Sequence, residues 1–205
     1  WDFKKKEPVE TMYLGEDGLI PLEVKFMHNP DSSHGFCGAA LSANVIHFWK
    51  SKEGKWEWEK IIDVENEPHP DWPIPVPGVM SAILVSMDDK YLYLNNWLHG
   101  DMRQYDISDP HKPKLTGQVW MGGLLGKAPV VNGVKIAGGP QMYQLSLDGK
   151  RMYVTTSLFS TWDNQFYPEI RTQGGAMIMI DCDVENGGMK INKDFIVDFG
   201  KEPNG

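Results

Sequence analysis

The stretch SMDDKYLY (Ser86–Tyr93) decides the fold, because it returns sixty residues later as SLDGKRMY (Ser146–Tyr153). Each copy follows a short apolar run, Ala82–Val85 in the first case and Met142–Leu145 in the second. An Asp-Asp or Asp-Gly pair followed by lysine is typical of the tight turn of a β-hairpin. The repeat therefore predicts two related units, each of which opens with a hairpin.

Further short strands follow each hairpin and complete the two units. The candidate third strands are Met102–Asp106 and Met177–Asp181, and the candidate outer strands are Leu115–Trp120 and Phe195–Phe199. An earlier and more diverged unit is expected to contain strands at Glu23–Met27, Phe36–Leu41, Val45–Lys50 and Trp56–Asp63. We also expect one N-terminal strand at Val9–Leu14.

Three four-stranded units in series predict an all-β fold, and a β-propeller rather than a sandwich. We expect residues 1–205 to form a partial β-propeller with blades at 22–64, 79–120 and 141–199. The links rich in proline and glycine, 68–78 and 122–140, and an insertion at 162–175 are expected to be loops. Three blades do not close a ring, so we expect exposed strand edges and association with a missing half or with another chain.

Composition narrows the class of protein. A net charge of −8 argues against a nucleic-acid partner, and no apolar stretch is long enough for a transmembrane segment. Cys37 and Cys182 fit either one disulfide in a secreted domain or, as we favour, free buried thiols in a reducing compartment. We expect a cytoplasmic protein, with the nucleus or a peripheral membrane position as alternatives. Because the chain opens on Trp1 within what looks like a domain, we interpret it as a fragment.

Four stretches of the chain resemble the methanethiol oxidase family, whose members are also called selenium-binding proteins. The resemblance covers almost the whole chain, which matches the later part of the family's sequence. The stretches are DGLIPLE (17–23) with FMHNPD (26–31), NWLHGDMRQYDISDP (96–110), AGGPQM (137–142) with QLSLDGKR (144–151), and DFGKEP (198–203).

The resemblance implies a seven-bladed propeller with its active centre on the axis. It implies copper-dependent oxidation of methanethiol by oxygen and water to formaldehyde, hydrogen sulfide and hydrogen peroxide, with a small thiol and O2 as substrates. The family's selenium-associated cysteine lies in sequence absent from this chain, as do its early histidine-rich motifs. We therefore expect this chain alone to be inactive. The alternative is a non-catalytic selenium-binding or scaffold propeller with a role in protein transport.

Two histidines are the candidate metal ligands. His28 and His99 each match a family histidine where a strand meets a turn, and imidazole is a good copper ligand. We expect both to reach one rim of the axial channel; the alternative for each is a hydrogen bond to a turn or to a neighbouring blade. His99 and Asp101 are the candidate catalytic residues, with the Asp101 carboxylate either orienting an imidazole or closing a corner. Arg103 is expected to pair with Asp106 or with a neighbouring blade.

The remaining polar motifs are not predicted to be sites. His69 and His111 lie beside prolines in polar loops and are expected at the surface, and His47 matches no family histidine. His34 could form a weak metal site close to His28, but we do not predict one. The run GGPQ (138–141) resembles a phosphate-binding loop, but it lacks the lysine spacing of such loops and opens a strand rather than a helix.

Overall fold

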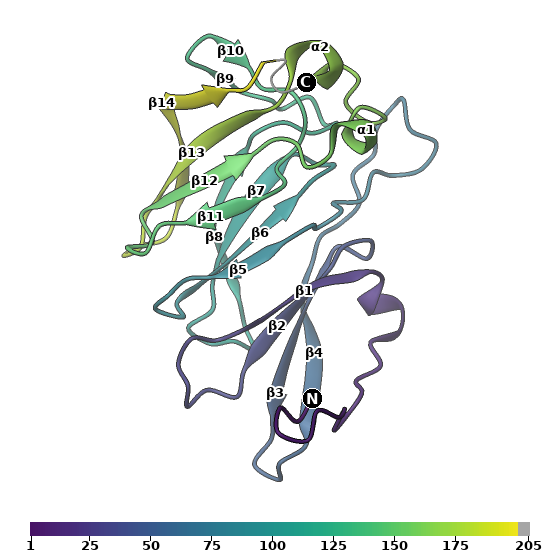
Figure 1. Cartoon of the computed structure of the whole chain (residues 1–205), viewed down its shortest axis with the longest axis vertical. Coiled ribbons are helices and arrows are strands. Elements are labelled where there is room, and N and C mark those ends of the chain that lie inside the picture. Colours follow the sequence, from purple (N-terminus) through teal and green to yellow (C-terminus); the bar gives the residue numbers. More distant parts are fainter. Residues whose placement is uncertain (201–205) are drawn as a thin grey trace.

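The computed structural model describes residues 1–200 as three four-stranded antiparallel sheets, which follow one another along the long axis of the molecule (Figure 1). The first sheet consists of β1 (Pro21–Phe26), β2 (Gly35–Ala39), β3 (Asn44–Lys50) and β4 (Trp56–Asp63). The second consists of β5 (Ile83–Val85), β6 (Tyr91–Asn96), β7 (Asp101–Asp106) and β8 (Lys114–Trp120). The third consists of β11 (Tyr143–Leu145), β12 (Arg151–Thr155), β13 (Ala176–Cys182) and β14 (Met189–Asp198). The predicted all-β class is confirmed.

The other elements are short and lie between or beside the sheets. They are a 3-10 helix η1 (Gly15–Gly18), the hairpin of β9 (Val130–Val131) and β10 (Val134–Lys135), and the single-turn helices α1 (Ser160–Asp163) and α2 (Ile170–Gln173). Within the described part of the chain, no helix has the length and apolar character needed to cross a membrane. Lys201–Pro203, the end of the resembling stretch 198–203, lie outside the described residues.

The predicted N-terminal strand at Val9–Leu14 is wrong. These residues form no strand, and the side chains of Met12 and Leu14 instead pack against Ile46 and Phe48 on one face of the first sheet. The apolar residues of this segment therefore cover a sheet face rather than extend a sheet edge.

The two repeated hairpins have the same hydrogen-bond pattern. The Asp88 carboxylate accepts bonds from the Ser86 hydroxyl and the Lys90 amide, and Asp148 accepts the equivalent bonds from Ser146 and Lys150. Each turn has one residue with positive φ, 59° at Asp89 and 73° at Gly149. The predicted repeat is thus a structural repeat as well.

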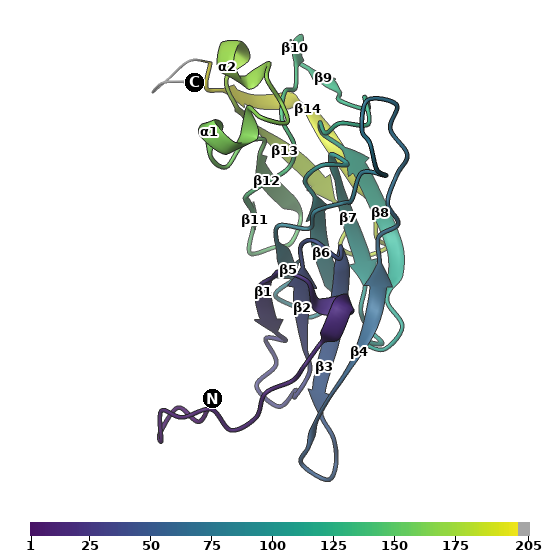
Figure 2. The same ribbon diagram turned by 90° about the vertical axis from the view of Figure 1, so that its right-hand side faces the viewer.

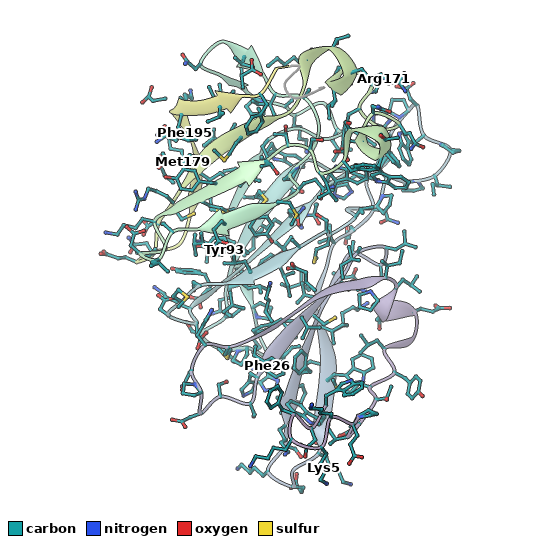
Figure 3. All side chains as sticks on the ribbon, viewed as in Figure 1. Lys5, Phe26, Tyr93, Arg171, Met179 and Phe195 are labelled. Atoms are coloured by element: carbon teal, nitrogen blue, oxygen red, sulfur yellow. The ribbon has the colours of Figure 1, made fainter. Side chains whose placement is uncertain are left out.

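The core forms where the sheets pack face to face. Between the first and second sheets, Phe36 and Val45 lie in one cluster with Ile83 and Leu92. Between the second and third, Tyr93, labelled in Figure 3, lies in a cluster with residues of β12 and β13. This face-to-face stacking is the arrangement expected of propeller blades, and Figure 2 shows the strands of the sheets spread side by side.

Antiparallel pairing gives the stack two rims. The loops 27–34, 86–90 and 107–113 connect strands at one end of the sheets, and we call this end the His28 rim. The turn 97–100, which follows β6, lies at the other end together with the segments 122–124 and 137–140. We call that end the His99 rim.

Candidate functional site

His99 lies in the four-residue turn between β6 and β7 and is completely buried. Its Nε2 atom is 2.8 Å from the carbonyl oxygen of Val76. Since a carbonyl only accepts, Nε2 must carry the hydrogen, and Nδ1 of a neutral ring is then unprotonated. Nδ1 is buried and has no hydrogen-bond partner among residues 1–200. The turn therefore presents a free imidazole lone pair.

Close contact between backbone segments holds this turn in place. A Cβ atom at Gly123 would overlap the carbonyl of His99, and one at Gly139 would overlap the carbonyl of Trp97. The Tyr167 hydroxyl also donates a 2.6 Å bond to the Trp97 carbonyl. The glycine run that resembles a phosphate loop is therefore part of the packing of the His99 rim.

Buried polar atoms without partners gather at this turn. Of the seven buried polar side-chain atoms without a partner in the described chain, three belong to one four-residue segment, namely Asn96 Oδ1, Trp97 Nε1 and His99 Nδ1. Buried polar atoms are nearly always hydrogen-bonded in folded proteins, because each unpaired one costs about 1–3 kcal/mol. Such a concentration marks a place where something besides fold stability has shaped the sequence.

Asp101 does not contact His99. Its fully buried carboxylate accepts bonds from Asn96 (3.0 Å), from Nε of Arg103 (2.7 Å) and from Gln118. The hydrogen bond that orients His99 goes to a backbone carbonyl instead. Arg103 pairs with Asp101 and not with Asp106, because alternate residues on a strand share a face whereas Asp106 lies three positions away.

His28 lies at the opposite rim from His99. Its Nδ1 atom is 3.1 Å from a carboxylate oxygen of Asp89, in the hairpin that precedes β6, whereas His99 follows β6. The six residues of β6 separate the two by about 20 Å. The expectation that His28 and His99 share one rim is therefore wrong, and one metal ion cannot bind both.

Three other histidines do come together. His34, His47 and His111 have ligand nitrogens that all lie within 4.8 Å of one another. Burial lowers the pKa of His47 to about 4, so this ring is neutral at physiological pH. Sequence reasoning missed the cluster. The pairing of Phe36 with His47 across β2 and β3 places His34 and His47 on neighbouring positions of one face, but nothing local indicates the approach of His111.

The two cysteines are free and buried, as expected. Burial raises the pKa of the Cys182 thiol to about 12, and it also raises the pKa of Cys37. Both are therefore neutral thiols at physiological pH, which is the state of structural cysteines rather than of nucleophiles.

Comparison with known proteins identifies the relatives of this chain. Over its whole length it is 51% identical to methanethiol oxidase of Xenopus tropicalis and 50% identical to human methanethiol oxidase. It is 49% identical to selenium-binding protein 2 of Mus musculus. In each case it covers 47% of the relative, so the chain spans about half the length of the curated proteins it matches.

Solved structures show the same relationship and confirm the propeller class. A hypothetical selenium-binding protein from Sulfolobus tokodaii superposes with a TM-score of 0.89 at 40% identity, over 98% of this chain and 46% of that one. A periplasmic gluconolactonase of Pseudomonas aeruginosa, with a TM-score of 0.56 and 13% identity over 89% of this chain and 41% of that one, shares the fold alone. The model of the 56 kDa selenium-binding proteins, SBP56, matches residues 1–205, and the chain belongs to that family.

Proposed function

We propose that this chain forms part of a methanethiol oxidase, which converts methanethiol, O2 and water into formaldehyde, hydrogen sulfide and hydrogen peroxide. Support comes from identity of about 50% over the whole chain to proteins of that name. In this reaction the methyl carbon loses two electrons, which reduce O2 to hydrogen peroxide, and water supplies the oxygen of formaldehyde. The free buried thiols fit the reducing cytoplasm that we propose as its location.

The observation that carries the proposal is the unpaired Nδ1 atom of His99. Copper is the proposed cofactor, and it would supply the one-electron steps between the thiol and oxygen. An unprotonated imidazole nitrogen is a donor that suits copper, and the other ring nitrogen is fixed by a backbone carbonyl, as is usual for a metal-bound histidine. At the His99 rim the residues therefore fit a copper ion, with His99 as one ligand.

The neighbours of His99 have supporting roles. The carbonyl of Val76 holds the hydrogen on Nε2, so that the lone pair stays on Nδ1. Val76, Trp97 and Leu98 belong to one buried apolar cluster, which excludes bulk water from the turn. Asp101 fixes the start of β7 through Asn96 and is a positioning residue in this proposal, not a ligand.

A tight copper site needs more than one donor. His28 cannot provide a second one, because it lies at the opposite rim. We propose that the further ligands come from residues outside this chain, which would make the chain inactive by itself.

Removing the imidazole of His99 tests the proposal in the whole protein. His99→Ala should lose bound copper and methanethiol-dependent oxygen uptake together, measured by metal analysis and with an oxygen electrode. His69→Ala, at a loop histidine outside the site, is the matched control and should retain both. Lost turnover with unchanged copper would replace the ligand role by proton transfer at Nδ1. Unchanged copper and turnover would exclude His99 from the site.

A second candidate is a selenium-binding scaffold without catalysis. It is favoured by the description of the family and by the 49% identity to a selenium-binding protein of mouse. On this alternative the purified wild-type protein would bind no stoichiometric copper and would consume no oxygen with methanethiol. The same two measurements therefore separate the two candidates.

A further inference from the structure

The cluster of His34, His47 and His111 joins two sheets at the His28 rim. His34 directly precedes β2, and His47 lies within β3 of the same sheet. His111 comes from the loop between β7 and β8 of the second sheet. The cluster is therefore separate from His99, which lies at the opposite rim, and it does not depend on the proposed oxidase activity.

Glu59 of β4 sets the tautomers of two of these rings. One oxygen of its carboxylate is 3.2 Å from Nδ1 of His47 and also in contact with Nδ1 of His111. A carboxylate accepts hydrogen bonds, so both Nδ1 atoms carry hydrogen, and in the neutral form of each ring the lone pair is then on Nε2. A carboxylate behind a histidine is the usual outer partner of a metal-binding imidazole.

The third ring faces the same point. Nδ1 of His34 is 2.8 Å from Nε2 of His47, the ring planes differ by 7° and the ring centres are 5.0 Å apart. These values place the two rings edge to edge in nearly one plane, rather than stacked on their faces. A single hydrogen lies between the two nitrogens, and it occupies the position at which both lone pairs would meet a cation.

We propose that His34, His47 and His111 bind a divalent transition-metal ion, through Nδ1 of the first and Nε2 of the other two, with Glu59 orienting the rings. Imidazole suits both zinc and copper(II). The bound metal would replace the hydrogen shared by His34 and His47, and that hydrogen would move to Nε2 of His34, so that all three rings bind as neutral imidazoles.

The geometry requires only a small adjustment. In a tetrahedral zinc site with Zn–N bonds of about 2.0–2.1 Å, ligand nitrogens lie about 3.4 Å apart. Nδ1 of His34 and Nε2 of His47, now 2.8 Å apart, would open to that distance, and the spread of up to 4.8 Å closes if His111 turns inward; the His111 side chain is 41% exposed and on a loop. His47 is fully buried and would stay fixed, packed beside Trp49.

A metal at this place would act as a clamp between two blades. His34 and His47 belong to the first sheet and His111 to the second, so one ion would tie the loop 107–113 to the face of β3. Metal that binds the folded state alone raises the stability of that state.

Zinc binding by the whole protein tests the clamp. The protein is stripped with EDTA and titrated by calorimetry with Zn²⁺ alone, and in a second arm with Cu²⁺ alone. Wild type should bind one more equivalent than His111→Gln. Glu59→Gln should bind that equivalent about 10–100-fold more weakly, because it removes the outer partner of two ligands. His69→Gln is the control and should match wild type.

Stability provides a readout that does not depend on counting metal ions. Zn²⁺ should raise the thermal midpoint of wild type and of His69→Gln, but not that of His111→Gln, which alters an exposed loop and should fold. Equal affinity, stoichiometry and thermal shift in all variants would overturn the proposal and leave the cluster as a hydrogen-bonded network. Binding of Cu²⁺ but not Zn²⁺, lost in His111→Gln, would support the site and assign it to copper.

Discussion

Asp101 joins three strands of the second sheet through one buried carboxylate. Its partners come from β6, β7 and β8, namely Asn96, Arg103 and Gln118. Removing one member of a buried ion pair costs about 3–5 kcal/mol, because the other charge is left without a partner. We therefore expect Asp101→Ala to lower the free energy of unfolding by that amount, measured by urea denaturation.

An exposed ion pair provides the matched control. Asp63 pairs with Lys60, but its side chain is 59% exposed, and such pairs contribute about 0–1 kcal/mol. Asp63→Ala should therefore change stability by less than 1 kcal/mol. Equal losses in the two variants would show that the Asp101 network contributes no more than a surface contact.

At the residue scale, the sequence predicts a functional residue only where that residue lies in a recognisable motif. His99 was found because it lies in a long stretch that resembles a known family, and the structure gives it a free lone pair. For Asp101 the sequence left open whether the carboxylate orients an imidazole or closes a corner, and in the structure it accepts a bond from Asn96 across the turn and not from His99. The three-histidine cluster was missed because His111 is brought to His47 only by the packing of one blade on another.

At the element scale, the second copy of the repeated hairpin is a natural control for a substitution in the first copy. Asp89 and Gly149 occupy the same place in the two turns, and both have positive φ. The Asp89 carboxylate additionally accepts bonds from the amides of His28 and Asn29, at 2.7 and 2.8 Å. Asp89 thus ties the second blade to a loop of the first.

Asp89→Gly should leave the hairpin intact and release that loop. Glycine adopts positive φ without strain, so the turn should keep its hydrogen bonds as the second copy does. The amides of His28 and Asn29 should exchange hydrogen faster by tenfold or more, since bonds to a charged acceptor contribute about 1.5–3 kcal/mol. Hydrogen exchange followed by NMR measures the exchange rates of the hairpin amides and of these two loop amides. Faster exchange throughout residues 86–91 would show that the hairpin itself is disrupted, and would contradict the prediction.

The positions of the strands were largely predictable from the sequence. The direction of each strand also predicts the rim at which it ends. Hairpin signals and apolar runs located most of the twelve strands of the three sheets closely, but β14 begins at Met189, six residues before the predicted Phe195. His28 follows the first strand of its blade and His99 the second, and consecutive antiparallel strands end at opposite rims. The expected topology therefore already separates the two histidines. The Val9–Leu14 error arose because an apolar segment can pack on a sheet face as well as add a strand.

At the scale of the whole molecule, the first sheet exposes apolar side chains on one of its faces. In the first sheet Val24 and Phe26 are 56% and 57% exposed, and Phe26 is visible on this sheet in Figure 3. They line an apolar groove of about 500 Å³ together with Phe48, Trp56 and Trp58. Association through this face, as well as through the strand edges expected from the sequence, remains a prediction.

The 205-residue chain should self-associate at micromolar concentration in sedimentation experiments, because large exposed apolar patches favour association. Val24→Lys should shift it towards monomer by placing a charge in the groove. Leu147→Lys, at a side chain that is 85% exposed outside this face, should not. A monomeric wild type would contradict association through this face.

In the proposed copper site, Nδ1 of His99 binds the metal while Nε2 keeps its hydrogen. Long-range ¹H–¹⁵N NMR of the histidine-labelled whole protein tests it most directly, because copper(I) is diamagnetic and each ring nitrogen has its own signal. Assignment comes from the signals lost in His99→Ala. We predict that one equivalent of copper(I) shifts the Nδ1 signal of His99 and leaves its Nε2–H signal in place. Stoichiometric copper binding with the His99 signals unmoved, or a shift at Nε2 instead, would contradict the account.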